Sequence, residues 1–93
     1  MNIVFTPSFQ RSYKKFTKGN ESLQEKINNT LRLLASDPAS QELKTHKLSG
    51  KLQGLFACSC GYDCRIIFLI EENKSTKEKT VILVDIGTHD EVY

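Results

Sequence analysis

Two apolar runs in the second half of the chain, residues 64–70 and 80–86, constrain the fold most strongly. The first reads CRIIFLI and the second TVILVDI, and both are rich in β-branched side chains. Runs of roughly 4–8 such residues are typical of buried strands. Because the segment between them, 71–79, is dominated by charged and polar residues, we expect a hairpin loop there, with the two runs as neighbouring strands of a sheet.

Two helices are predicted ahead of these strands. Thr6 can cap the first helix, Pro7 suits its first position, and Gly19 offers its end. Asn20 can cap a second helix that ends near residues 36–38. Apolar side chains recur at helical spacing in both segments: Phe9, Tyr13 and Phe16, then Leu23, Ile27, Leu31 and Leu34. The short link between them predicts an antiparallel helical hairpin.

The remaining segments complete an α+β pattern. Residues 2–5 form a short β-type run, residues 41–54 indicate loop with a short strand, and residues 55–60 indicate a strand that turns at 61–63. Helices followed by a meander of strands predict an α+β domain, with the helix hairpin packed on one face of a small antiparallel β-sheet. At 93 residues we expect a single domain spanning 1–93.

Composition and charge indicate where the protein is located and what kind of partner it binds. No apolar stretch approaches the ~20 residues that a membrane span needs, and the first residues lack the pattern of an export signal. We therefore expect a cytoplasmic protein with no membrane partner. Residues 1–51 hold nine Lys or Arg against four Asp or Glu, and residues 52–93 hold four against seven, so net charges of +5 and −3 make up the total of +2. This asymmetry fits an acidic partner, either nucleic-acid phosphate or an acidic protein, although a solvated helix face would give the same charge pattern.

Three cysteines lie within the stretch CSCGYDC, at positions 58, 60 and 64. Their odd number, without an export signal, argues against a disulfide framework. The C-x-C spacing places two thiols on the same side of a strand and offers no C-x-x-C knuckle, so we expect neither zinc nor another cofactor, even with His46 and His89 as further ligands. Small apolar strand residues are the preferred interpretation.

Arg65 is out of place in the apolar run DCRIIFLI. A guanidinium keeps its proton in a protein interior, so it needs an anion nearby. Two interpretations remain open: a salt bridge to Asp63 or Asp85, or a clamp for a phosphate ligand.

With these residues identified, the sequence resembles the RelE/ParE superfamily of bacterial toxins from type II toxin–antitoxin pairs, and most closely its YafQ-like branch. The resemblance covers the whole chain. It rests on a histidine ahead of L-x-G at His46, an aspartate before a central strand at Asp63, and the C-terminal GTH motif at His89, followed by Tyr93. In this branch the resemblance implies a messenger-RNA endonuclease of the ribosomal A site, without a metal, in which the 2′-OH of the RNA attacks the adjacent phosphate.

That chemistry needs a base, an acid and cations around the phosphate. The resemblance points to His46, Asp63 and His89 for proton transfer and to Tyr93 as a ring that stacks on a base. Arg65 would stabilise the phosphate charge, with Lys44, Lys47 and Lys51 binding the RNA. It also implies a cognate antitoxin, with operator DNA bound only through the antitoxin complex.

Some alternatives stay open. Where YafQ-like members often carry a second histidine, this chain has Cys58 or Ser59, which leaves the assignment of acid and base open. Asp63 and Arg65 are two residues apart and should face the same way. A ParE-like toxin that traps DNA gyrase without cutting RNA is the second hypothesis, and an inactive family member is the third. On the simplest interpretation, His89 and Tyr93 only cover the end of the last strand.

Overall fold

The computed structural model describes residues 1–93, and its two long helices confirm the predicted caps. Helix α1 (Pro7–Thr17) begins after Thr6, whose side chain accepts a hydrogen bond from the Phe9 amide. Helix α2 (Glu21–Ser36) begins after Asn20, whose side chain accepts from the Leu23 amide. Between them, Gly19 has a φ of 71°, a left-handed conformation that glycine adopts without steric cost and that lets the chain reverse. None of the helices has the length and apolar character to cross a membrane.

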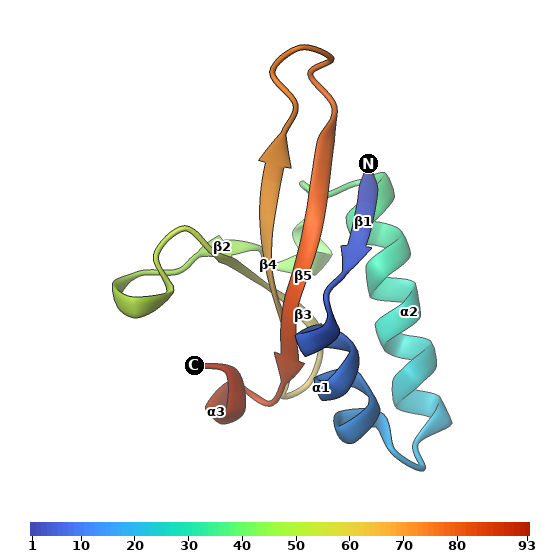
Figure 1. The fold of residues 1–93 in the computed structure, drawn as a ribbon. Coiled ribbons are helices and arrows are strands. Elements are labelled where there is room, and N and C mark those ends of the chain that lie inside the picture. Colours follow the sequence, from blue (N-terminus) through green and yellow to red (C-terminus); the bar gives the residue numbers. More distant parts are fainter.

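Five strands form one sheet in the order β1-β5-β4-β3-β2. The strands are β1 (Asn2–Phe5), β2 (His46–Lys47), β3 (Phe56–Gly61), β4 (Cys64–Glu72) and β5 (Lys79–Gly87). The predicted antiparallel meander of β3, β4 and β5 is confirmed, and β2 extends it on one side. On the other side β1 pairs with β5 in parallel, so the sheet is mixed at this edge. Two short 3-10 helices, η1 (Gln41–Leu43) and η2 (Gly50–Leu52), flank β2, and Figure 1 shows how the β4–β5 hairpin projects beyond the rest of the sheet.

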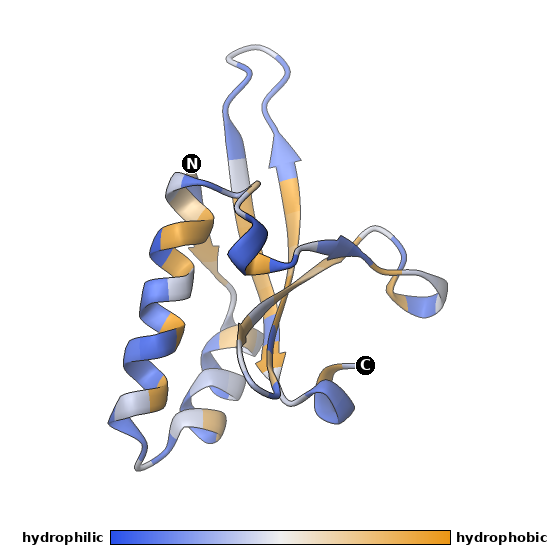
Figure 2. Ribbon diagram, turned by 180° about the vertical axis from the view of Figure 1, so that it is seen from behind, coloured by the Kyte–Doolittle hydropathy of each residue, from blue (hydrophilic) through white to orange (hydrophobic).

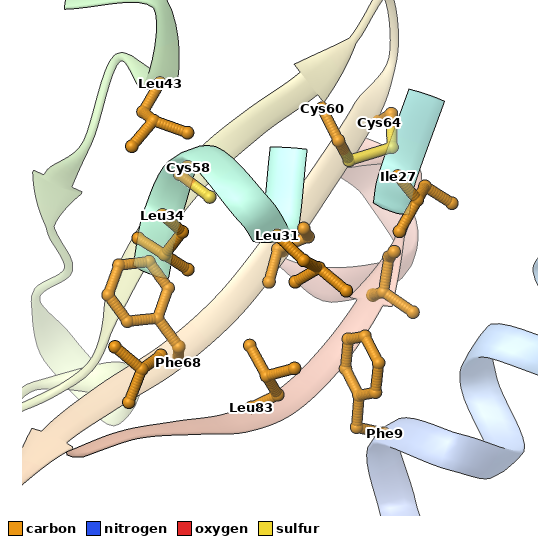
Figure 3. Packing of buried hydrophobic residues seen from close by; sticks show 13 residues of the cluster. Phe9, Ile27, Leu31, Leu34, Leu43, Cys58, Cys60, Cys64, Phe68 and Leu83 are labelled. Carbon is orange, nitrogen blue, oxygen red and sulfur yellow. A yellow bond between two sulfur atoms is a disulfide. The ribbon is translucent and has the colours of Figure 1, made fainter. Parts of the chain in front are cut away.

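Both long helices pack on the same face of the sheet, as the sequence predicts. Figure 2 shows the hydrophobic residues of α2 on the side that faces the strands, whereas the loop between β4 and β5 is hydrophilic. In the core, Phe9 of α1 and Ile27, Leu31 and Leu34 of α2 lie over side chains of β3, β4 and β5 (Figure 3). Phe68 and Leu83 are almost fully buried beneath them. Each such side chain contributes about 1.5–3 kcal/mol on burial, so this single interface holds the helices in place.

The cysteines depart from the prediction in one respect. Cys60 and Cys64 form a disulfide across the turn between β3 and β4, with their Cα atoms 5.0 Å apart, so the expectation of unpaired thiols is wrong for this pair. The physical reason is that both residues point into the core from the two ends of a tight turn, within the Cα range that a disulfide spans. Cys58 is free and buried in the same cluster, and the placement of Cys58 and Cys60 on one side of the strand is confirmed.

The face of the sheet away from the long helices carries the residues of functional interest. His46, Ala57, Ile67 and Asp85 occupy successive strands in one row of the register. Ser59, Arg65 and Gly87 form the next row, near the turn that the disulfide closes. Arg65 alternates with the core residues Cys64 and Ile66, which explains how one cation can lie within an apolar run.

Candidate functional site

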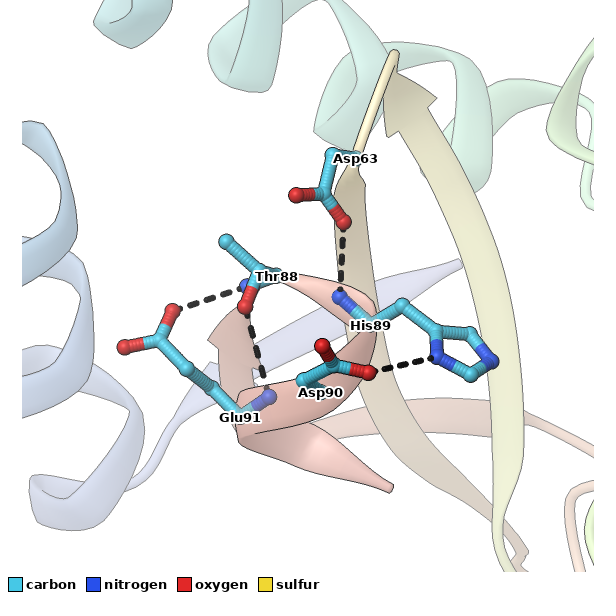
Figure 4. A network of polar contacts seen from close by, with 5 residues as sticks. All are labelled: Asp63, Thr88, His89, Asp90 and Glu91. Carbon is cyan, nitrogen blue, oxygen red and sulfur yellow. Dashed lines mark hydrogen bonds and ion pairs between the residues drawn. The ribbon is translucent and has the colours of Figure 1, made fainter.

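The C-terminal residues form a short helix, α3 (His89–Val92), rather than a loose tail. The Thr88 hydroxyl accepts a hydrogen bond from the Glu91 amide, and the Glu91 carboxylate accepts one from the Thr88 amide at 2.9 Å (Figure 4). This reciprocal pair is a capping box, which stabilises the first turn of a helix. A Cβ at Gly87 would lie only 3.0 Å from the Glu91 carboxylate, so glycine permits the close return of the chain. The chain therefore turns back after β5, and it does so in helical form.

Asp63 fastens this helix to the turn between β3 and β4. Its side chain accepts a hydrogen bond from the His89 amide at 3.0 Å, which Figure 4 shows bridging the two segments. Asp63 has a φ of 50°, which aspartate tolerates better than most side chains. Because one of its oxygens binds the first amide of α3, Asp63 holds His89 in position in addition to any chemical role.

Three aromatic side chains meet beside α3. The rings of His89 and Tyr93 lie edge to face with centroids 4.5 Å apart, and the Tyr93 hydroxyl lies 3.3 Å from Nε2 of His46. Nδ1 of His46 lies 3.3 Å from the carbonyl oxygen of Lys44. Since a carbonyl can only accept, Nδ1 donates there, and in a neutral ring Nε2 then accepts from Tyr93. Partial burial raises the pKa of Tyr93 above its ordinary value, an effect that the positive charge of Arg65 partly offsets, so the hydroxyl stays protonated and able to donate.

A cleft of about 660 Å³ opens next to this cluster, between the turn of β3 and β4 and the segment that carries η1. It is bordered by side chains that could bind and cleave an anionic polymer, namely Lys44, Arg65, His89 and Asp63. Further lining residues include Glu42, Ser59 and Tyr62, which the sequence analysis did not assign. Lys47 lines a separate depression with Phe56, and Lys51 lies in η2, so neither shares this cleft.

Arg65 makes its hydrogen bonds through a single nitrogen. Nη1 donates to the carbonyl oxygens of Cys64 at 2.8 Å and Gly61 at 3.1 Å, and lies 3.5 Å from the Ser59 hydroxyl. No carboxylate lies within salt-bridge distance, so the hypothesis of a pair with Asp63 or Asp85 is wrong. The backbone carbonyls fix the guanidinium, while Nε and Nη2 make no hydrogen bond within the protein. Two donor positions thus remain for an anionic ligand, as a phosphate clamp requires.

The imidazole of His89 is exposed on the cleft side of the helix. Its Nδ1 lies 3.5 Å from the Asp90 carboxylate, a contact that is an ion pair only when the ring is protonated, and its Nε2 has no partner within the protein. A nitrogen that is free and faces a cleft can exchange a proton with a ligand. No group of three or more His, Cys, Asp or Glu side chains is arranged to hold a metal ion.

Comparison with known proteins gives a consistent result. Residues 1–93 match the model of the family described as the bacterial YafQ toxin of type II toxin–antitoxin systems. Comparison with curated proteins gives no match. The fold is similar to that of YafQ from E. coli strain BL21(DE3), with a TM-score of 0.78 and 17% identity over 99% of this chain and 97% of that one.

Two further structures with this fold are complexes. YafQ in the E. coli DinJ–YafQ complex superposes with a TM-score of 0.77 at 18% identity, covering 99% of this chain and 97% of that chain. The matching chain of the YoeB–YefM complex from Staphylococcus aureus gives 0.72 at 23% identity, covering 96% and 97%.

Proposed function

Because the chain belongs to the YafQ family of bacterial type II toxins, we propose that it is a ribosome-dependent messenger-RNA endonuclease that inhibits translation. The observation that carries the proposal is the placement of His89 and Arg65 on one cleft, each with nitrogen atoms that make no hydrogen bond within the protein. A protein that only binds a partner has no need of an unpaired imidazole nitrogen and a half-paired guanidinium on one cleft. Both groups are what RNA cleavage through the 2′-OH requires.

In this mechanism the 2′-oxygen of one nucleotide loses its proton to a base and attacks the adjacent phosphorus. The bond from phosphorus to the 5′-oxygen of the next nucleotide breaks, and an acid protonates that oxygen. The products are a 2′,3′-cyclic phosphate and a free 5′-hydroxyl. We assign one of the two proton transfers to His89, because an imidazole nitrogen can accept or donate a proton and its Nε2 has no partner within the protein.

Arg65 stabilises the charge that builds on the phosphate in the transition state. Its Nε and Nη2 are free, and its position is fixed in advance by the carbonyls of Gly61 and Cys64. Donors that are already oriented need no reorganisation during the reaction, which is the main source of their effect. Lys44 lies on the same cleft and adds a second cation for the RNA backbone.

His46 and Tyr93 lie beside His89, and Tyr93 contacts both histidines. The ring of Tyr93 packs against His89 and its hydroxyl reaches His46, so we assign Tyr93 to ring packing and base stacking. In the neutral state both nitrogens of His46 are occupied, by Lys44 and Tyr93. Protonation of His46 would make Nε2 a donor, so that Tyr93 would accept and its own proton would be freed for a ligand.

A cognate antitoxin is the partner we propose. The family is one of toxin–antitoxin systems, and related chains were solved in the DinJ–YafQ and YoeB–YefM complexes. The excess of positive charge in residues 1–51 suits an acidic antitoxin segment. Its affinity for this chain should fall as salt is raised, and an affinity independent of salt would remove the electrostatic part of the proposal.

Primer extension on a translated message, with and without ribosomes, tests the activity. We expect cuts that require ribosomes and that disappear in His89→Ala, with the variant still folded and still bound by the antitoxin. Lys74→Ala, an exposed change in the distant β4–β5 loop, is the matched control and should cut normally. If His89→Ala stays fully toxic and arrest comes with DNA damage instead of cut messages, the nuclease proposal fails in favour of gyrase inhibition.

A further inference from the structure

Tyr62 is the most exposed of the large hydrophobic side chains of the protein. Its relative exposure is 102%, against 42% for Tyr93. It makes no hydrogen bond and pairs with no other ring, whereas Tyr13 and Tyr93 each pack against an aromatic neighbour. Exposure of one aromatic residue is not unusual by itself. Tyr62 is unusual because its turn is fixed and because cations line the same cleft.

A disulfide and a hydrogen bond fix the turn that carries Tyr62. The disulfide between Cys60 and Cys64 closes the turn beneath it, and the next residue, Asp63, is bonded to the amide of His89. The backbone of Tyr62 is therefore fixed, and its ring retains only the rotations of a tyrosine side chain. A ring held in this way loses little conformational entropy when a ligand covers it.

The guanidinium of Arg65 lies directly beside the same residue. Nη1 donates at 3.1 Å to the carbonyl of Gly61, which belongs to the peptide group that joins Gly61 to Tyr62. Tyr62, Arg65 and Lys44 all line the cleft. Tyr62 thus presents a solvent-facing ring on the cleft that two cations also line. Proteins hold single-stranded nucleic acid with such a combination, because each base has a face to stack and each nucleotide has a phosphate to bind.

We propose that Tyr62 is a positioning residue that stacks on a base of the RNA strand whose phosphate contacts Arg65. The inference rests on the proposed function and extends it to a second aromatic contact, separate from Tyr93. Stacking of this kind tolerates any base, so Tyr62 contributes affinity and alignment more than sequence preference. An exposed tyrosine could instead contact a protein partner, and the experiment separates the two.

The chain contains no tryptophan, so Tyr62→Trp places a single reporter on the turn. An uncleavable 2′-O-methyl RNA oligonucleotide should quench its fluorescence in a saturable and salt-dependent manner. An abasic strand of the same length carries the phosphates without the bases and should bind with little quenching. Phe5→Trp, on strand β1 and outside the cleft, is the matched control and should not respond.

Loss of the ring should then weaken binding to RNA. Tyr62→Ala should lower the affinity for the same oligonucleotide about 5- to 150-fold, and Tyr62→Phe should restore it. In cleavage of ribosome-bound messages, Tyr62→Ala should raise KM more than it lowers kcat. Full exposure of Tyr62 means that the variants should unfold at the temperature of the wild type, which circular dichroism checks.

Equal quenching by RNA and the abasic strand, or an unchanged RNA affinity in Tyr62→Ala, would overturn the proposal. Loss of antitoxin binding with RNA affinity intact would assign the ring to a protein partner. The two proposals fail separately. Stacking of RNA in Tyr62→Trp, together with a wild type that cuts no message, contradicts only the nuclease. A wild type that cuts messages, together with a Tyr62→Ala variant that cuts them equally well, contradicts only the stacking residue.

Discussion

Reduction of the disulfide between Cys60 and Cys64 should destabilise the protein without unfolding it. The bridge joins positions separated by 4 in the sequence, so it closes a loop of five residues. The loop-entropy relation gives about 7 cal/mol/K for such a loop, or ~2 kcal/mol at 25 °C. For a chain of this size, that corresponds to a fall in Tm of roughly 8–16 °C. Both sulfurs lie within the core, and reduction removes no side-chain atoms, so it leaves no cavity.

Thermal unfolding followed by circular dichroism, with and without a phosphine reductant, measures the effect. Thiol titration in denaturant should count one thiol before reduction and three after it. The Cys60→Ala/Cys64→Ala variant has no bridge to lose, so its Tm should not respond to the reductant and controls for other effects of the reagent. A wild type whose Tm is unchanged, although the thiol count rises to three, would refute the reasoning that the bridge restricts the unfolded chain.

Four further predictions concern single residues. Arg65→Met should keep the fold, since only backbone carbonyls and a hydroxyl lose a hydrogen-bond donor. Its cleavage rate in the ribosome assay should fall about 10²–10³-fold. Unfolding of this variant would contradict the conclusion that Arg65 has no acidic partner. Tyr93→Phe should retain most cleavage and Tyr93→Ala should lose most of it, and equal loss in both would assign the function to the hydroxyl. Asp63→Asn, which keeps an acceptor for the His89 amide, should cleave far better than Asp63→Ala, and a matching loss in both would make the carboxylate itself a proton carrier. Burial raises the pKa of Cys58 from 9.0 to about 12, so as the pH rises the thiol loses its proton in the unfolded chain before it does so in the folded one. The free energy of unfolding should therefore fall by up to ~1.4 kcal/mol per pH unit between about pH 9 and 12. Chemical denaturation over this range should show a shallower decline for Cys58→Ala than for the wild type.

Local signals explain why the helices and the meander were predictable. Thr6 and Asn20 act on amides only three residues away, so their caps can be identified from the sequence. The apolar runs of β4 and β5 lie inside the sheet, with a neighbouring strand on both sides. The run of β4 is continuous because consecutive residues such as Ile66 and Ile67, which point to opposite faces, are both buried. Helix α3 has too few residues to show a period, yet the spacing of Thr88 and Glu91 is that of a capping box and would have identified it.

Features that depend on distant partners were not predictable in the same way. The anchoring role of Asp63 arises from an amide 26 residues away, and the parallel pairing of β1 depends on β5 at the other end of the chain. Arg65 satisfies its charge with backbone carbonyls, which every residue carries, so a sequence gives no sign of them. The pairing of Cys60 with Cys64 depends on a turn that brings the two residues together. The odd number of cysteines and the lack of an export signal both argued against a disulfide, so the sequence did not predict this bond.

The pairing of β1 with β5 also has a consequence for synthesis. Asn2 cannot pair until its register partner Thr80 has been synthesised. At a synthesis rate of about 5–20 residues per second, this takes roughly 4–16 s. During that time neither the sheet edge nor the cleft is complete, because His89 is made later still. Pairing between such distant segments is slow to form. Under the proposed function, the chain therefore lacks a complete cleft until its synthesis is almost finished, and the proposed antitoxin has several seconds in which to meet the nascent chain before that cleft forms.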